Sequence, residues 1–395
     1  MLHSFPDDIV ILGAARTPVG KFDGALREVP AHELGALVIR TALERAGVQP
    51  SQVGEVVMGQ VGQVGPDAYN ARRCAFAAGL PNNVTAQNVN RLCGSGLQAI
   101  WTGAHLLAVG SAAVVVAGGN ESMSRMPYLD FATRREVPKL GNRSLVDGTL
   151  AMLTDPFGGY PMGVTAEHVA ERCGVSRAEQ DDFAVESHRR ALAAAADGTF
   201  AEQIVAVPLA SGSTLTADEH PRGSTVQALA QLRPVFMAEG SVTAGNSSGI
   251  SDGAAAVVMT TAARARSAGL RPLLRFIDAV VVGNDPQLMG IAPVLAVQRL
   301  LQRTGVALAD IDVIELNEAF AAQAVAVVRE LGLDPKRVNP NGGAIAIGHP
   351  IGATGSILTV KLLYELRRTG GRLGMVTLCI GGGQGIAALF AAPDF

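Results

Sequence analysis

The chemistry most readily expected from this sequence centres on Cys93, within NRLCGSGL. A strand is predicted to end near Val89, and a helix is predicted after the glycines, over residues 97–109. Cys93 would then lie at a helix N-terminus, where the dipole and free N–H groups should lower a thiol pKa from about 8.5. A thiolate is a nucleophile, and Gly94 and Gly96 would let a substrate approach the backbone. A buried structural cysteine is the open alternative.

A second candidate segment is residues 341–355, NGGAIAIGHPIGATG, which contains His349 among glycines and small residues. An imidazole in such a loop can polarise a thiol or donate to a developing oxyanion. A histidine in a surface loop is the alternative interpretation. The chain has seven histidines, and the other six lack comparable surroundings, which favours His349 as a functional residue.

Two further polar residues follow predicted buried strands. Cys379 lies at the end of one strand, before a turn that begins at Gly381, and Asn317 directly follows a strand over residues 313–316. Ligands of α/β proteins usually bind at strand ends. A buried Asn there can hold a catalytic water, although a turn-forming Asn before a helix would give the same pattern.

The elements that must position these residues are predicted to occur twice. Each copy reads as the end of a helix, a glycine stop at Gly47 or Gly305, and then a buried strand. If the copies are related by a pseudo-twofold axis, Cys93 and His349 should approach one centre from opposite sides. The matching segments are residues 43–58 with 301–316, 89–109 with 338–367, and 114–119 with 377–382.

Strands alternate with helices in both copies, which implies sheets covered by helices on both faces. The predicted class is therefore α/β, with two duplicated halves packed together. Residues 123–249 fit neither copy and contain an Ala-rich helix near residues 184–196, so an inserted substrate-binding domain is expected there. The predicted divisions are an N-terminal half of residues 1–122 plus 250–272, the inserted domain of residues 123–249, and a C-terminal half of residues 273–395.

The composition argues against several classes of protein. At 395 residues, two or three domains of roughly 100–200 residues are expected, and 48% apolar residues exclude a disordered chain. A net charge of -3 without a Lys/Arg run argues against nucleic acid as a partner. No apolar stretch reaches the ~18 residues of a membrane span. Residues Met1–Pro6 lack the pattern of a secretory signal, so we expect a cytoplasmic protein.

The four cysteines do not suggest a metal site, because none lies in a CxxC pair. Disulfides are also rare in cytosolic chains. Cys74 and Cys173 are therefore interpreted as buried small hydrophobic residues. Only Cys93 and Cys379 have surroundings that suggest chemistry.

Together, these segments resemble the thiolase family over essentially the whole chain and in the family's order. The resemblance implies a layered α/β/α/β/α architecture and an acyltransferase activity. The matching segments are AARTPVGKF from Ala14, NRLCGSGLQA around Cys93, GGNESMS from Gly118, TAGNSSGISDGAAA from Thr243, NEAF from Asn317, GGAIAIGHPIGATG from Gly342 and CIGGGQG from Cys379.

The resemblance also implies a role for each catalytic residue. Cys93 would take the acyl group from an acyl-CoA, and His349 would activate Cys93 and hold the thioester oxygen of the second acyl-CoA. Asn317 would position a water in that same oxyanion hole, and Cys379 would move the α-carbon proton. The backbone N–H groups of Cys93 and Gly381 would form the other oxyanion hole.

Coenzyme A and acyl-CoA are the substrates that the resemblance implies, without a permanently bound cofactor. Met162 would lie near the acyl group, and arginines such as Arg222 would assist in binding a polyanionic ligand. A homodimer or homotetramer is also expected. The residues expected to line the pantetheine tunnel are Phe236, Ala244, Ser248 and Phe320.

The branch of the family stays open at Tyr160–Gly163. Acetoacetyl-CoA-forming thiolases usually have YHMG there, whereas this chain has Pro161 in place of the histidine. We predict an acetyl-CoA C-acetyltransferase, with a degradative 3-ketoacyl-CoA thiolase of broader chain length as the alternative. A non-catalytic acyl-CoA-binding relative would lack one of the catalytic residues. A nicotinamide-dependent dehydrogenase is disfavoured because residues 13–18 do not form a GxGxxG turn. A decarboxylating condensing enzyme usually has a histidine in place of Asn317.

Overall fold

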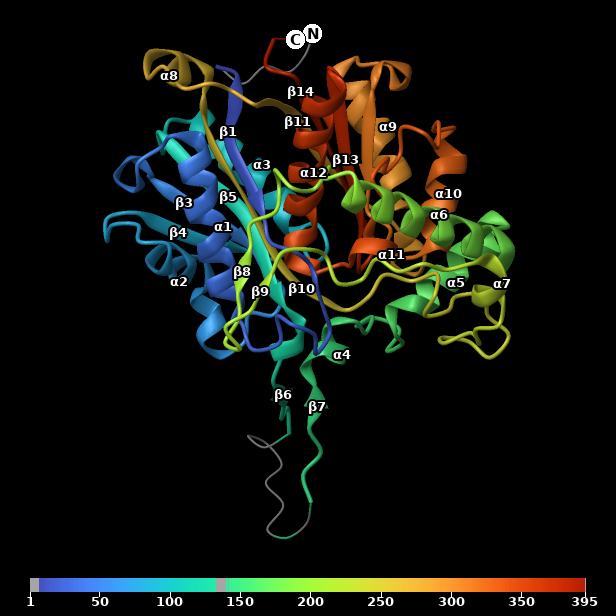
Figure 1. Cartoon of the computed structure of the whole chain (residues 1–395). Helices are drawn as coiled ribbons and strands as arrows, with labels where there is room; N and C mark the ends of the chain where they lie inside the picture. The colour runs from blue at the N-terminus through green and yellow to red at the C-terminus, as the bar shows by residue number, and fades with distance from the viewer. Residues whose placement is uncertain (1–6, 133–139, 141, 395) are drawn as a thin grey trace.

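The computed structural model describes residues 7–132, 140 and 142–394. Within them, the strands of both halves join in one 10-stranded sheet of order β12-β13-β14-β11-β1-β10-β5-β3-β4, with β2 beside β10. Figure 1 shows the blue and cyan strands of the N-terminal half beside the red strands of the C-terminal half. Residues Met1–Pro6, on which the expectation of no secretory signal rested, lie outside the described residues.

The N-terminal half combines residues before 123 with a strand that returns after 250. β3 is parallel to β4 and β5, and β10 is antiparallel to both β5 and β1. Helix α1 ends at Gly47, whose φ of 66° is a left-handed conformation that favours glycine. The elements are β1 (Ile9–Arg16), β2 (Gly20–Lys21), α1 (Ala31–Ala46), η1 (Pro50–Gln52), β3 (Glu55–Gly59), η2 (Gly65–Tyr69), α2 (Asn70–Ala77), β4 (Thr85–Val89), α3 (Ser95–Ala108), β5 (Val114–Ser122), β10 (Ser251–Thr261) and α8 (Ala262–Ser267).

The C-terminal half repeats this arrangement. β12 is parallel to β13 and forms a parallel bridge from Ile314 to Val338, and β14 is antiparallel to β13 and β11. Helix α9 ends at Gly305, with a φ of 71°. The elements are β11 (Leu274–Gly283), η4 (Pro286–Ile291), α9 (Ala292–Thr304), η5 (Leu308–Asp310), β12 (Val313–Leu316), α10 (Ala321–Leu331), α11 (Ala344–Ile347), η6 (Ile351–Ala353), α12 (Thr354–Thr369), β13 (Leu373–Ile380) and β14 (Gln384–Ala391).

The predicted duplication is confirmed by strand order and pairing direction. The N-terminal order β4-β3-β5-β10-β1 matches the Val338 bridge followed by β12-β13-β14-β11. The two sets of strands meet where β1 pairs with β11, from Ile9 opposite Phe276 to Ile11 opposite Leu274. This short ladder joins two similar halves side by side.

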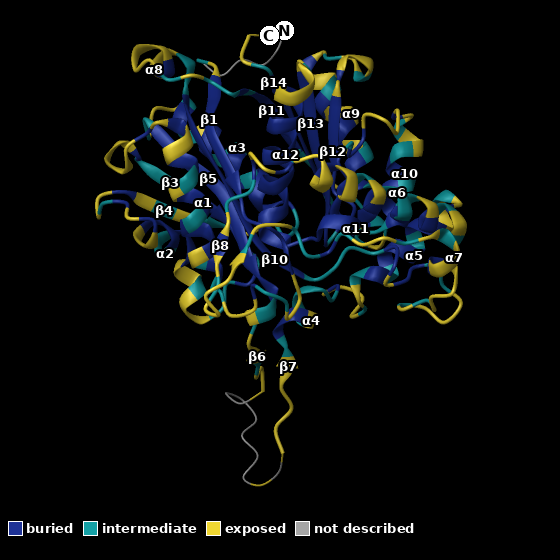
Figure 2. Cartoon of the chain, viewed as in Figure 1, coloured by how far each residue is buried: buried dark blue, intermediate teal, exposed yellow. Residues whose placement is uncertain are grey.

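The layers follow the predicted α/β/α/β/α order. Helices α1 and α2 pack on the outer side of the N-terminal strands, α9 packs on the outer side of the C-terminal strands with α10 beside it, and α3 and α12 pack together between the halves. Alternate residues of β1 serve different layers, since Ile9 and Ile11 belong to the central core while Val10 and Leu12 belong to the outer one. Figure 2 shows the strands and α12 deeply buried, with exposed residues on the outer helices.

The inserted region consists of short elements and two longer helices. α6 begins at Arg177, seven residues before the Ala-rich part that predicted it, because Ser176 and Glu179 form a capping box. Within the described residues, every helix is too short or too polar to span a bilayer. The elements are η3 (Met123–Arg125), β6 (Tyr128–Leu129), β7 (Val146–Asp147), α4 (Gly148–Met152), α5 (Met162–Cys173), α6 (Arg177–Ala196), β8 (Val207–Pro208), β9 (Thr214–Leu215) and α7 (Val226–Ala230).

Candidate active site

A cavity of about 370 Å³ lies where the two halves and the inserted region meet. Cys93 from the N-terminal half and His349 and Gly381 from the C-terminal half line the same cavity. The two matching loops of the duplicated halves therefore converge on one centre, as the pseudo-twofold argument predicted. The inserted region and its junction supply much of the remaining wall, including Met162 and Phe236.

Cys93 is held by a tight turn between β4 and α3. Leu92 has a φ of 45°, a left-handed conformation that a leucine rarely adopts, and it directly precedes the cysteine. The Ser95 hydroxyl accepts a hydrogen bond from Arg91 N–H (2.9 Å) and donates to the Leu92 carbonyl (2.6 Å). The turn therefore fixes Cys93 at the start of α3 through bonds within five residues of sequence.

The expectation of a lowered pKa for Cys93 is wrong. Burial raises the pKa of its thiol to about 11, and the backbone N–H groups of Gly381 and Cys93 offset only part of that effect. The side chain is only partly exposed. Cys93 is therefore a neutral thiol at rest and needs a base at the moment of attack.

The glycines beside Cys93 also have a different role from the one predicted. A Cβ on Gly94 would lie 2.6 Å from the Ile380 side chain, and a Cβ on Gly96 would lie 2.7 Å from Ser356 N. Neither glycine lines the cavity. They allow the C-terminal half to pack closely against α3, so they serve the junction of the halves rather than the approach of a substrate.

His349 is buried and its ring orientation is fixed on both sides. The Thr354 hydroxyl lies 2.6 Å from Nδ1 and donates its own proton to the Pro350 carbonyl at 3.0 Å. Asn317 Nδ2 lies 3.5 Å from Nε2. Both contacts favour a proton on Nδ1 and an unprotonated Nε2, which accepts the weak hydrogen bond from Asn317 Nδ2. Burial lowers the pKa of His349 to about 4, so the imidazole is neutral and can accept a proton through Nε2.

Asn317 is fully buried directly after β12, where its N–H donates to the Thr377 carbonyl at 2.9 Å. Its side-chain Oδ1 is buried and has no hydrogen-bond partner among the described residues. Such an atom is costly unless a ligand or water satisfies it. Asn317 does not line the cavity itself but contacts His349, which does.

Cys379 lies at the end of β13, against the side of the cavity. It is fully buried in a cluster with Met289 and Ala319, both of which line the cavity. Burial raises the pKa of the Cys379 thiol, and the neighbouring Cys93 raises it further. The predicted glycine turn follows, with positive φ at Gly382 and Gly383.

The five residues expected to bind the acyl-CoA all line the cavity, although Arg222 does not. Phe236 and Phe320 meet edge to face, with ring centroids 6.0 Å apart. Arg222 is exposed, and its N–H donates to His188 at 3.4 Å. Among the described residues that line this cavity, none is charged at neutral pH, so it suits an apolar chain rather than a phosphate group. The five are Met162, Phe236, Ala244, Ser248 and Phe320.

The thiolase N-terminal domain model matches residues 9–263, and the thiolase C-terminal domain model matches residues 270–392.

The chain belongs to the thiolase family.

Its relatives are similar over nearly their full length. Beta-ketothiolase BktB of Cupriavidus necator is 52% identical to this thiolase over 390 residues, covering 97% of this chain and 98% of the relative. An acetyl-CoA acetyltransferase of Pseudomonas aeruginosa is 49% identical, with coverages of 97% and 99%. The crystal structure of human mitochondrial 3-ketoacyl-CoA thiolase in complex with CoA has a TM-score of 0.95 and 40% identity, covering 98% of both chains. The chain is therefore an acyltransferase.

Several residues of this thiolase site were missed by the sequence analysis. Thr354 orients the imidazole, and Met289 and Ile351 complete the apolar wall. Ser251 accepts a hydrogen bond from His349 N–H at 3.0 Å. Glu121 lies near Cys93 and contributes to raising its pKa. Thr354 lies within the quoted GGAIAIGHPIGATG segment, where it is one of few polar residues, and Glu121 is the one charged residue of GGNESMS, so both could have been found from these motifs.

Proposed function

We propose that this thiolase is an acetyl-CoA C-acetyltransferase that joins two acetyl-CoA molecules through an acyl-Cys93 intermediate, in a reversible Claisen condensation. The cavity shared by Cys93, His349 and Gly381 is the observation that carries the proposal. Relatives named acetyl-CoA acetyltransferase support the choice of substrate. The presence of Cys93, Asn317, His349 and Cys379 in one region argues against a non-catalytic acyl-CoA-binding protein.

In the first half-reaction, the Cys93 sulfur attacks the thioester carbon of acetyl-CoA, and His349 Nε2 accepts the thiol proton. The CoA thiolate leaves and takes up that proton, which gives acetyl-Cys93 and free CoA. The backbone N–H groups of Cys93 and Gly381 would stabilise the carbonyl oxygen during attack. Both groups lie close enough to the Cys93 sulfur to lower its pKa, which supports this assignment.

In the second half-reaction, His349 Nε2 takes up the Cys379 thiol proton, and the resulting Cys379 thiolate removes a proton from the α-carbon of a second acetyl-CoA. The carbanion attacks the acetyl carbon and releases the Cys93 thiolate, which takes the proton from His349, so that acetoacetyl-CoA forms and both thiols are restored. His349 and a water held by Asn317 would stabilise the enolate oxygen. The unpartnered Oδ1 of Asn317 beside the His349 ring supports such a water site.

A broader 3-ketoacyl-CoA thiolase is the second candidate, and Pro161 is the observation that favours it. Pro161 lines the cavity where acetoacetyl-CoA-forming relatives usually have a histidine. The similarity to Beta-ketothiolase BktB and to human mitochondrial 3-ketoacyl-CoA thiolase supports the same candidate. Comparing kcat/KM for thiolysis of acetoacetyl-CoA and of a C8–C10 3-ketoacyl-CoA separates the two. A clear preference for the longer chain would replace the first candidate by the second.

The wider context of the enzyme is part of the proposal. We place the protein in the cytoplasm as a homodimer or homotetramer, with acyl-CoA as substrate and no permanently bound cofactor. The hairpin β6–β7 projects from the body in Figure 1 and exposes Tyr128 and Phe131, which supports association through that surface. We also propose the domain division at residues 122/123, 249/250 and 272/273. The junction of the two family models, between residues 263 and 270, lies shortly before the last of these divisions and supports that one.

The test of the mechanism is mass spectrometry after brief exposure to acetyl-CoA. We expect an acetyl adduct on Cys93 that is absent from the Cys93→Ala variant. Failure of the folded wild-type protein to form the adduct, under conditions where it binds acetyl-CoA, would overturn the proposal.

A further inference from the structure

The segment that carries His349, residues 345–352, is held at both ends by buried carboxylates. Ile345 N–H donates to Glu318 Oε2 at 3.2 Å, and Gly352 N–H donates to Glu121 Oε2 at 2.8 Å. We call these residues the His349 segment. The backbone of this segment therefore depends on the side chains of Glu318 and Glu121, neither of which belongs to the segment.

Glu121, on β5, connects the His349 segment to the N-terminal half. Besides Gly352 N–H, its carboxylate accepts from Val61 N–H (2.9 Å) and from Gly62 N–H (3.0 Å). The side chain is 1% exposed. A Cβ on Gly352 would lie 2.6 Å from Glu121 Oε2, so the contact is tight. Glu121 therefore joins the His349 segment to residues 61–62, which follow β3 in the same half as Cys93.

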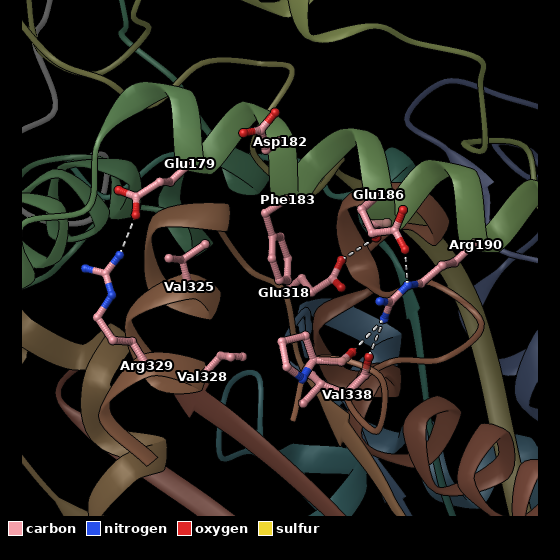
Figure 3. Close-up of a pocket in the computed structure, with 12 residues that line it drawn as sticks. Glu179, Asp182, Phe183, Glu186, Arg190, Glu318, Val325, Val328, Arg329 and Val338 are labelled. Atoms are coloured by element: carbon pink, nitrogen blue, oxygen red, sulfur yellow. Dashed lines mark hydrogen bonds and ion pairs between the residues drawn. The ribbon is translucent and has the colours of Figure 1, made fainter. Parts of the chain in front are cut away.

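Glu318 connects the His349 segment to Asn317, its neighbour in sequence, and to α6. Its carboxylate accepts from Ser187 Oγ (2.7 Å) and from Asn339 Nδ2 (2.7 Å), besides Ile345 N–H. Ser187 in turn accepts from Gly343 N–H at 3.1 Å. Figure 3 shows the Glu318 side chain pointing toward α6, in a cavity of about 370 Å³ between α6 and α10.

Both carboxylates are buried without a salt bridge, although the Lys361 charge partly offsets the burial of Glu318. Among the salt bridges of the described residues, none includes Glu121 or Glu318, and the nearby Lys361 is bonded to Glu315 instead. Burial raises the pKa of both carboxyl groups. Each carboxylate accepts only from N–H or O–H donors. Its two oxygens can accept from all of these donors, whereas a Gln amide has one acceptor oxygen and an NH₂ group that can only donate.

We propose that Glu121 and Glu318 are positioning residues for the two oxyanion sites, with Glu121 setting the distance between Cys93 and His349, and Glu318 setting Asn317 against the His349 ring. The proposal rests on the proposed function for the identity of the two half-reactions. Glu121 should matter most for acylation of Cys93, because it links the two halves that meet in that step. Glu318 should matter most for condensation, because it follows Asn317 directly and does not contact the N-terminal half.

The experiment compares Glu121→Gln and Glu318→Gln with wild type in the full chain. Three quantities are measured: the rate of Cys93 alkylation by iodoacetamide, the single-turnover rate of Cys93 acetylation by acetyl-CoA, and kcat and KM for thiolysis of acetoacetyl-CoA. A displacement of about 1 Å at a reacting group costs about 10²-fold in rate. The Glu121 charge raises the Cys93 pKa, so its removal alone would speed alkylation. We expect the displacement to outweigh this effect, so that Glu121→Gln slows alkylation and acetylation by about that factor, with KM within about threefold. We expect Glu318→Gln to leave both within about threefold and to lower kcat by about 10²-fold.

Glu167→Gln is the matched control. Glu167 is also a buried carboxylate without a salt bridge among the described residues, and it accepts from Ser241 N–H (2.9 Å) and Val242 N–H (2.8 Å). Glu167 does not contact the His349 segment, so we expect kcat of Glu167→Gln to stay within about twofold of wild type. Its melting temperature should change by about as much as that of Glu121→Gln and Glu318→Gln. If a Gln variant does not fold, Glu121→Asp or Glu318→Asp, which keeps the charge but shortens the side chain, is measured in its place with the same expectation.

The outcomes separate the positioning role from the proposed function. If the wild-type protein is not acetylated, the proposed function is wrong. The alkylation rates would still test the positioning role of Glu121. A Glu121 variant that is alkylated and acetylated at the wild-type rate overturns its role. Equal loss of both half-reactions in the two variants, or an equal loss of kcat in Glu167→Gln, shows a general structural effect and overturns the proposal.

Discussion

The Cys93 turn and the His349 segment occupy matching places in the duplicated halves but are held in different ways. Cys93 is positioned by its neighbours, through the left-handed Leu92 and the bonds of Ser95 to Arg91 N–H and the Leu92 carbonyl. The His349 segment is positioned by residues from other elements, which are Glu121, Ser251 and Glu318. Cys93 therefore has a locally encoded geometry, whereas the geometry of the His349 segment exists only in the assembled fold.

The largest effect should come from Cys93→Ala, which tests the local half of this comparison. We expect a loss of thiolysis activity of about 10⁴-fold or more, because the acyl carrier is removed. The melting temperature should stay within a few degrees, since the turn is held by backbone and Ser95 contacts that the substitution leaves in place. Steady-state kinetics and circular dichroism measure the two quantities. Substantial residual turnover would mean that another residue carries the acyl group.

Cys379→Ser should separate the two half-reactions. Acetylation of Cys93 should continue at close to the wild-type rate, whereas condensation should fall by about 10²–10⁴-fold, the usual contribution of a positioned base. Single-turnover acetylation and steady-state condensation are compared in the same preparation. Parallel loss of both rates would contradict the assignment of the α-proton to Cys379.

The burial of His349 predicts a pH-dependent contribution to stability. Its folded-state pKa is about 4, below the ordinary value of 6.5, so its contribution is present above pH 6.5 and is lost as pH falls toward 4. The difference in unfolding free energy between wild type and His349→Gln should grow by about 2 kcal/mol from pH 5 to pH 6.5. Urea unfolding at several pH values measures it. A difference that does not change with pH would show that the ring is not buried in its neutral form.

The smallest effect should come from Thr354→Val, which removes the hydroxyl beside His349 Nδ1. The ring keeps its place in the fold but loses the contact that favours one tautomer, so we expect kcat to fall by about tenfold, with KM nearly unchanged. Ser95→Ala is the corresponding change in the Cys93 turn. Ser95 supports the fold of the Cys93 turn, whereas the Thr354 side chain only orients a ring that other elements hold in place. We therefore expect both variants to lower kcat and only Ser95→Ala to lower the melting temperature.

The sequence predicted the elements and the catalytic positions because those depend on local patterns. Strand ends before Cys93 and Asn317, and at Cys379, are visible as apolar runs that stop at polar or glycine residues. The repeat predicts that His349 lies opposite Cys93, and both residues line one cavity. The Ala-rich part predicts a start of α6 seven residues after the observed one, because the capping box at Ser176 lies outside that part.

What the sequence by itself determined is the duplicated α/β fold and the thiolase family, and it predicted most of the residues that line the cavity, since motif and periodicity are carried by neighbouring residues. Only the tertiary structure decided that burial raises the pKa of Cys93, that Gly94 and Gly96 serve the packing of the halves, and that Arg222 lies outside the cavity. It also decided that Glu121 and Glu318 hold the His349 segment. These properties depend on which distant elements surround an atom, and spacing along the chain does not contain that information.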